Sequence, residues 1–118
     1  MGRRRKVPIQ PWQTCGKDGE EKRYIRLGNT LLLHPAVKGL SDKAFRIYVH
    51  MLLESGGDRT FIFPRTKYKE FSGNTTFQRA KSELIEKGFI REKQNNKNLR
   101  KPNEYEFLEE WKKYTPPP

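Results

Sequence analysis

The chain has 118 residues, of which 33% are hydrophobic, and this is enough apolar material for one core rather than two. Its 25 basic and 14 acidic residues give a formal net charge of +11, which favours a polyanionic partner such as nucleic acid or an anionic membrane surface. No apolar run reaches the roughly 20 residues that span a bilayer, and the N-terminus has no apolar signal-peptide core, so we expect a cytoplasmic protein with no membrane partner.

The excess charge is unevenly placed along the chain. Residues 1–10 carry four positive charges and no negative ones, residues 64–87 carry six against three, and residues 88–103 carry five against one. Residues 41–63 balance at three each, and residues 104–118 carry two against four. The excess therefore falls in an arm, a helical pair and one loop, which is the kind of footprint expected on a nucleic-acid-binding surface.

The N-terminal part reads as an arm followed by a domain. Residues 1–22 are rich in Arg, Lys, Gly, Pro and Gln and cannot bury enough surface to order themselves, so we expect a basic flexible arm. The domain should span residues 23–114, with a tail at 115–118. Within it, residues 24–27 alternate polar and apolar as a short strand does, and residues 31–33 are an apolar patch of unclear type.

A helix is predicted from Ser41 to about Ser55. Ser41 is a favourable N-cap, and Leu40 before it can pack back on the first turns. Apolar residues then recur at helical spacing at Ala44, Phe45, Ile47, Tyr48, Met51 and Leu52. The polar residues form one narrow stripe, so this should be the central helix of the core.

A turn, a strand and a second helix should follow. Residues 60–63 combine aromatic and β-branched residues typical of a strand, and Pro64 suits the first turn of a helix. That short helix would direct Tyr68 and Phe71 inward. Residues 72–74 should break it, with Gly73 supplying a positive φ.

A third helix begins at residues 74–75, where Asn74 or Thr75 is expected to act as the cap, and ends at Gly88 as a left-handed cap. At 100° per residue its apolar side consists of Phe77, Ala80, Leu84 and Ile85. The opposite side consists of Thr75, Gln78, Arg79 and Ser82, with Thr76 at its margin. Lys81 is expected at the margin of the core, where its long stem can pack and its ammonium group can reach water.

The C-terminal part predicts a hairpin. Residues 89–93 open a strand, residues 94–101 form an Asn-rich basic loop, and residues 103–108 alternate apolar and charged side chains. The order helix, strand, helix, turn, helix, hairpin predicts an α+β fold: a winged helix-turn-helix with a three-helix core, a small antiparallel β-sheet and a C-terminal β-hairpin wing.

Residues 24–108, about three quarters of the chain, also resemble a known family. The resembling positions are Ile25, Arg26, Leu27, Leu32, Leu33, His34, Pro35, Lys38, Gly39, Leu40, Ser41, Ala44, Tyr48, Ala80, Leu84, Gly88, Phe89, Ile90, Lys101, Pro102, Asn103 and Tyr105. They are similar to the N-terminal domain of replication initiator proteins from plasmids and mobile elements of Gram-positive bacteria. The resemblance implies a DNA-binding protein that acts in replication initiation or transcriptional regulation of a mobile element or phage.

Double-stranded DNA is therefore the expected partner. In the docking that this fold implies, the third helix enters the major groove, where Arg79 can bind guanine and Gln78 adenine, while Thr75, Thr76 and Ser82 touch phosphates or thymine methyl groups. Backbone phosphates would be held by Arg65, Lys67, Lys97, Arg100 and Lys101. The arm could enter a minor groove through Arg3, Arg4, Arg5 and Lys6.

Simpler interpretations stand beside these. The polar side of the third helix could be an ordinary solvated face, the wing a soluble hairpin, and the arm a solubilising tail. A winged helix can also serve as a protein-protein interaction module without duplex binding, and RNA is a third candidate partner. An edge strand or the segment around Trp111 could pair two copies, so a homodimer is a further hypothesis.

No enzymatic function is expected. The pair Glu109 and Glu110 has no nucleophile, base or metal ligands near it in the sequence, and Cys15 is a single thiol without zinc-ligand neighbours. His34 and His50 are interpreted as a turn residue and a helix-stripe residue rather than ligands. We therefore expect no catalytic residue, no metal, no cofactor and no small-molecule substrate, with Trp12 and Trp111 acting as packing anchors.

Overall fold

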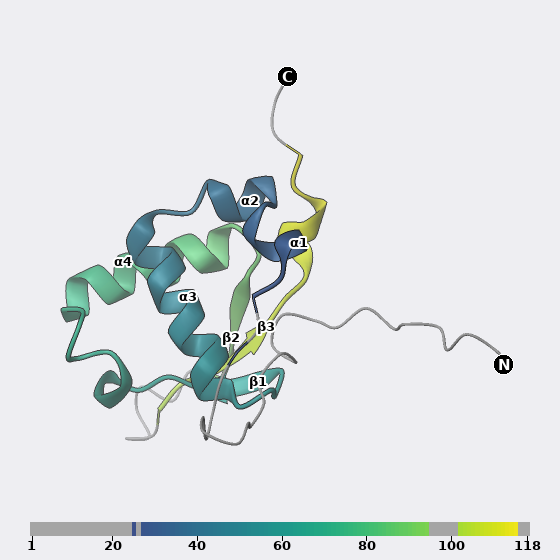
Figure 1. Ribbon diagram of the computed structural model, residues 1–118. Coiled ribbons are helices and arrows are strands. Elements are labelled where there is room, and N and C mark those ends of the chain that lie inside the picture. Colours follow the sequence, from purple (N-terminus) through teal and green to yellow (C-terminus); the bar gives the residue numbers. More distant parts are fainter. Residues whose placement is uncertain (1–24, 26, 95–101, 116–118) are drawn as a thin grey trace, which may run out of the picture.

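The computed structural model describes residue 25, residues 27–94 and residues 102–115, and within them shows an α+β fold with a small antiparallel sheet (Figure 1). The helices are α1 (Asn29–Leu32), α2 (Pro35–Lys38), α3 (Asp42–Ser55) and α4 (Asn74–Glu86), and the strands are β1 (Thr60–Ile62), β2 (Ile90–Gln94) and β3 (Glu104–Phe107). Two 3₁₀ helices complete the described elements, η2 (Arg65–Lys67) and η3 (Glu110–Lys113). The expected α+β class and antiparallel sheet are confirmed.

The sheet has the strand order β1-β3-β2, and both neighbouring pairs are antiparallel. Phe61 lies opposite Tyr105, and Ile90 lies opposite Phe107, so buried side chains share the face that the helices cover. This is the period-two alternation expected of a sheet with one buried face. The hairpin of β2 and β3 is confirmed, whereas its connecting loop at residues 95–101 lies outside the described residues.

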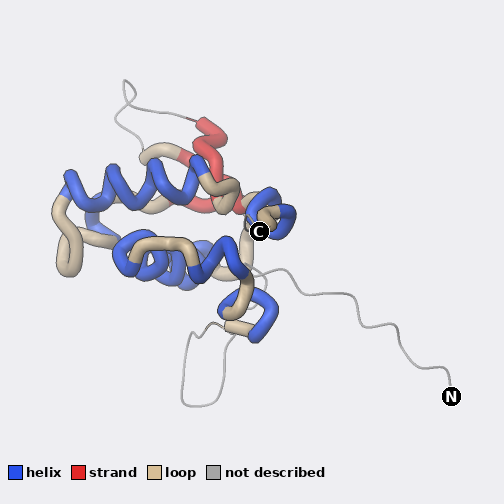
Figure 2. Tube along the Cα trace, turned by 90° about the horizontal axis from the view of Figure 1, so that it is seen from above, coloured by secondary structure: helices blue, strands red, loops and turns tan. Residues whose placement is uncertain are grey.

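The central helix α3 follows the sequence pattern closely. The Ser41 hydroxyl oxygen accepts a hydrogen bond from the Ala44 amide at 3.2 Å, which satisfies one of the free N–H groups of the first turn. Gly56 ends the helix in the left-handed conformation with φ of 63°. Seen from above, α3 and α4 lie side by side (Figure 2).

Aromatic rings fill the core between α3, the sheet and η3. Tyr48 meets Phe89 and Phe107 edge to face, with ring centroids 5.1 and 5.9 Å apart, and Phe89 stacks on Trp111 at 5.4 Å. Trp111 is 1% exposed, so its expected role as an anchor is confirmed. These contacts hold the C-terminal segment against the start of β2.

Gly88 makes this close packing possible. Its φ of 81° is left-handed, as expected for a residue just after a helix, and a Cβ at this position would lie only 2.7 Å from the Cβ of Glu110. The turn that follows α4 and the start of η3 therefore touch backbone to backbone.

The segment between β1 and α4 differs from the expectation. The predicted second helix is only the three-residue 3₁₀ helix η2, because the α-type backbone hydrogen bonds after it, from Lys69 to Arg65 and from Ser72 to Tyr68, are isolated rather than consecutive. Gly73 was expected to have a positive φ, but its φ is −76° and it occupies the N-cap position of α4 itself. Asn74 is already helical, so neither it nor Thr75 is the cap.

The structure also shows where Ile25, Leu27 and the apolar patch of residues 31–33 lie. Ile25 and Leu27 pack against the core, but neither lies in a strand. The apolar patch at residues 31–33 covers the end of α1 and its C-cap residue. Leu31 is buried, whereas Leu32 and Leu33 are exposed. Ile85, expected on the buried side of α4, is 37% exposed, whereas Leu84 in the same turn is fully buried.

Candidate nucleic-acid interface

The outer face of α4 consists of Thr75, Thr76, Gln78, Arg79 and Ser82, as the helical spacing predicted. Thr76 is half-buried and the other four are exposed, while Phe77, Ala80 and Leu84 on the opposite side are buried. The exposed four line a shallow hollow of about 570 Å³, together with Glu83, Glu86 and Lys87. The outer face thus presents one guanidinium, one amide and several hydroxyl groups to solvent, a set that can bind base edges or phosphates.

Stacked rings position the N-terminal end of α4. Tyr68 stacks on Phe77 with ring centroids 4.0 Å apart, and its hydroxyl donates to the Asn74 side-chain oxygen at 3.3 Å. Phe63 packs against both rings. The short η2 segment therefore supports the first turn of α4, although it is not a full helix.

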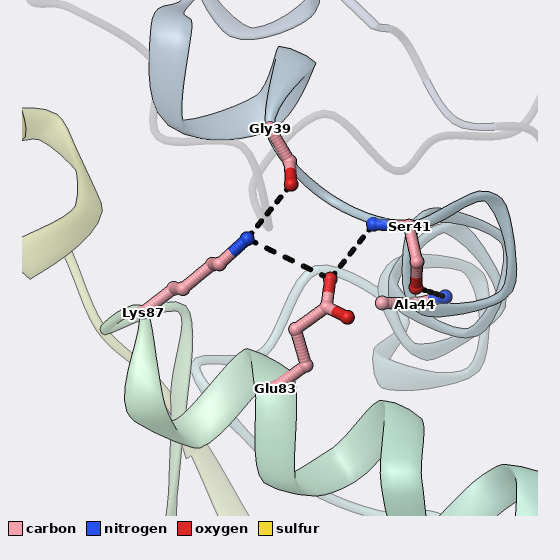
Figure 3. A network of polar contacts seen from close by, with 5 residues as sticks. All are labelled: Gly39, Ser41, Ala44, Glu83 and Lys87. Atoms are coloured by element: carbon pink, nitrogen blue, oxygen red, sulfur yellow. Dashed lines mark hydrogen bonds and ion pairs between the residues drawn. The ribbon is translucent and has the colours of Figure 1, made fainter. Parts of the chain in front are cut away.

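A polar network fixes α4 against the start of α3 (Figure 3). The Ser41 amide donates to Glu83 Oε2 at 2.8 Å, and Lys87 Nζ donates to the Gly39 carbonyl at 2.7 Å while lying 3.9 Å from the same Glu83 oxygen. In a capping box this acceptor would come from the third residue of α3, but that residue is Ala44. Glu83 supplies the missing carboxylate from another helix and so sets the position of α4 relative to α3.

Lys81 connects α4 to the hairpin. Its Nζ lies 2.9 Å from Glu92 Oε1 on β2 and 5.9 Å from the centre of the Tyr105 ring. Burial acts to lower the pKa of Lys81, but the hydrogen bond and charge of Glu92 and the contact with Tyr105 raise it overall. Lys81 lies at the margin of the core as predicted, and its charge is held within the domain.

The candidate backbone contacts are only partly described. Arg65 is exposed at the start of η2, whereas Lys67 lies next to Glu54, with 3.2 Å between Nζ and Oε2. The predicted wing residues Lys97, Arg100 and Lys101, and the arm residues Arg3, Arg4, Arg5 and Lys6, lie outside the described residues.

One cation beside the outer face was missed by the sequence analysis. Lys43, in the first turn of α3, lines a hollow together with Thr76 and Arg79 of α4. Residues 41–63 carry three positive and three negative charges, so the charge distribution along the sequence does not single Lys43 out. Its exposed position opposite the buried side of α3 was the only available signal, and many solvated lysines share that signal.

The two histidines make contacts within the domain. His34 caps α2, with Nδ1 accepting from the Ala36 amide at 3.1 Å, and Nε2 lies 3.2 Å from the Lys112 carbonyl. His50 stacks on Phe71 with ring centroids 4.3 Å apart. Burial and the Arg46 charge lower the pKa of His50, against the opposing effect of Glu54. Within the part of the chain that the structure describes, no group of three His, Cys, Asp or Glu residues could hold a metal ion.

The described helices include none that is both long and apolar enough to cross a membrane. Comparisons with protein-family models, with curated proteins and with solved structures found no match to this chain. Its function is therefore inferred from its own residues and their geometry.

Proposed function

We propose that the protein binds double-stranded DNA in a sequence-specific manner as a winged helix. The order of α3, β1, η2, α4 and the β2-β3 hairpin supports this fold, with α4 in the place of the recognition helix and the hairpin in the place of the wing. The resemblance of residues 24–108 to plasmid replication initiators favours a role in replication initiation or in transcriptional regulation of a mobile element or phage.

The observation that carries the proposal is the outer face of α4. In the described part of the chain, the side chains of Gln78 and Arg79 are exposed and neither makes a hydrogen bond or ion pair within the domain. A guanidinium can donate two parallel hydrogen bonds to guanine O6 and N7, and a glutamine amide can pair with adenine. Each such bidentate contact contributes about 1–3 kcal/mol of discrimination against the wrong base.

Phosphate contacts would orient the domain on the duplex. Arg65 and Lys67 are the first and last residues of η2, and Lys97, Arg100 and Lys101 belong by sequence to the wing. With about five phosphate contacts, the logarithm of the association constant should fall with the logarithm of salt concentration at a slope of about −4.5. Lys67 contributes less than a free lysine because Glu54 is 3.2 Å away.

The experiment that tests this function is selection of binding sites from a random duplex library, followed by affinity measurements on the selected duplex and a scrambled one. Arg79→Ala should remove most of the difference between the two duplexes and leave salt-sensitive binding to both. Lys113→Ala is the matched control, because it removes one positive charge from η3, the yellow segment beside α2 in Figure 1. Equal discrimination by Arg79→Ala and the wild-type protein would exclude α4 as the reading element.

A protein-protein interaction module is the second candidate function. A mostly apolar hollow of about 510 Å³ lies between α2, the end of α4 and η3, and half-exposed Tyr114 lines it. In this function the outer face of α4 also docks onto a partner protein instead of DNA, so no duplex binding is expected even at low salt.

A further inference from the structure

A second hollow lies beside the outer face, between the first turn of α3 and the middle of α4. It has a volume of about 380 Å³ and is lined by Ser41, Lys43, Thr76, Arg79, Ala80 and Glu83. Arg79 lines both this hollow and the one along the outer face. The two hollows are therefore adjacent and share one cationic side chain, Arg79, and one acidic side chain, Glu83.

The charges around this second hollow favour an anion. Lys43 and Arg79 are exposed, and neither forms an ion pair with another described residue. Glu83 is the only acidic residue in the lining, and its Oε2 already accepts the Ser41 amide at 2.8 Å and lies 3.9 Å from Lys87 Nζ. Asp42, next to Lys43 in the chain, is not part of the lining. Two cations thus line the hollow with one carboxylate, and Oε2 of that carboxylate is already occupied by the Ser41 amide.

We propose that this hollow binds a phosphodiester group of the DNA strand that borders the groove entered by α4. Lys43 supplies the ammonium group for the phosphate, and the Thr76 hydroxyl lies within the same lining as a second donor. The proposal rests on the proposed function, since it needs a duplex docked on α4.

The division of roles follows from which helix each side chain comes from. Lys43 belongs to α3 and lies beside the outer face, so it can reach the DNA backbone without entering the groove. Arg79 belongs to α4, the helix that enters the groove. The contact of Glu83 with Ser41 and of Lys87 with Gly39 holds the start of α3 on α4. The spacing between phosphate site and base-reading site is therefore fixed by the fold.

A phosphate contact and a base contact leave different signatures. Removal of one phosphate contact weakens binding to all duplexes alike and reduces the salt slope by about 0.9. If the variant and the wild-type protein bind equally at 1 M salt, this change in slope makes the variant's affinity about eightfold lower than the wild type's at 0.1 M monovalent salt. Loss of a base contact instead reduces the ratio between the selected and the scrambled duplex.

The test measures fluorescence anisotropy of the full chain with the selected and scrambled duplexes over a series of salt concentrations. Lys43→Ala should lower the magnitude of the slope by about 0.9 and weaken both duplexes equally, whereas Lys43→Arg should keep the slope and Lys113→Ala should match the wild-type protein. Unchanged thermal unfolding of Lys43→Ala verifies that the domain still folds.

Two results would overturn the phosphate site while leaving the proposed function intact: a slope for Lys43→Ala equal to that of Lys113→Ala, or a changed ratio between the two duplexes. Inorganic phosphate should not displace the duplex at an equal concentration of phosphate groups, and displacement by it would show a free-anion site instead. A wild-type protein that binds neither duplex at low salt would remove both the proposed function and this site.

Discussion

The close approach at Gly88 predicts a large loss of stability for Gly88→Ala. An alanine Cβ would lie 2.7 Å from Glu110 Cβ, 3.2 Å from the Trp111 amide nitrogen and 3.3 Å from the Glu110 carbonyl carbon. Two of these neighbours are backbone atoms, so the whole start of η3 must shift. Trp111 of η3 stacks on Phe89, the residue that follows Gly88. A shift of η3 therefore also disturbs the aromatic core.

The magnitude combines three effects. A non-glycine residue in the left-handed region costs roughly 1–2 kcal/mol, and overpacking of a close-packed site adds roughly 1–3 kcal/mol. Alanine lowers the conformational entropy of the unfolded chain, and this stabilises the variant by about 0.4–1 kcal/mol and offsets part of the loss. We therefore expect Gly88→Ala to lower the free energy of unfolding by about 1–5 kcal/mol, with a central value of about 3 kcal/mol.

Gly56→Ala is the matched control. Gly56 also has a left-handed φ, of 63°, but a Cβ there would meet nothing within 4 Å. Gly56→Ala should lower the free energy of unfolding only through the backbone conformation, by about 1 kcal/mol or less. Urea unfolding followed by tryptophan fluorescence and far-UV circular dichroism measures both variants. Equal losses in the two variants would refute the contribution of the Glu110 contact.

Three further predictions follow from individual contacts. Tyr48→Phe should raise the free energy of unfolding by about 1 kcal/mol, because the buried Tyr48 hydroxyl has no hydrogen-bond partner among the described residues; a lower melting temperature would contradict this. The hydrogen bond and charge of Arg91 hold the pKa of Glu106 below its ordinary value, so its stabilising effect is present above the unfolded-state pKa and is lost as pH falls through the folded-state pKa. Carboxyl NMR titration should show this low pKa, and Arg91→Ala should raise it, although the charges of Arg59 and Lys93 still act to lower it. Lys81→Met keeps the packed stem but removes the ammonium group that lies 2.9 Å from Glu92 Oε1, so it should cost about 1 kcal/mol in urea unfolding and should lose less than Lys81→Ala; equal losses would show that the stem contributes nothing.

Local signals were sufficient for much of the fold. Ser41 marks the start of α3 and Gly56 its end, and Gly88 marks the end of α4. These ends are predictable because a capping hydroxyl and a left-handed glycine act within a few residues of their own position. Alternation in β3 identified the hairpin strand, since its buried positions Tyr105 and Phe107 differ in type from their neighbours.

The parts that the sequence could not predict depend on packing between distant segments. The region after Pro64 has helical spacing, yet it forms only η2 and a following turn, and Tyr68 in that turn stacks on Phe77 of α4. The outer face of α4 was predictable from its period, whereas the hollow beside Lys43 exists only where α3 and α4 meet. No pattern within either helix reveals that pairing.

The hydrogen bond from the Ser41 amide to the Glu83 carboxylate also makes the Ser41 amide a reporter of whether α4 is packed against α3. The hydrogen bond joins the first turn of α3 to a side chain of α4, 42 positions later in the sequence. Protection of the Ser41 proton from exchange with water therefore requires α4 to be seated, even when α3 itself is intact. Hydrogen exchange at this one backbone position would measure how often the candidate reading helix detaches from the rest of the domain.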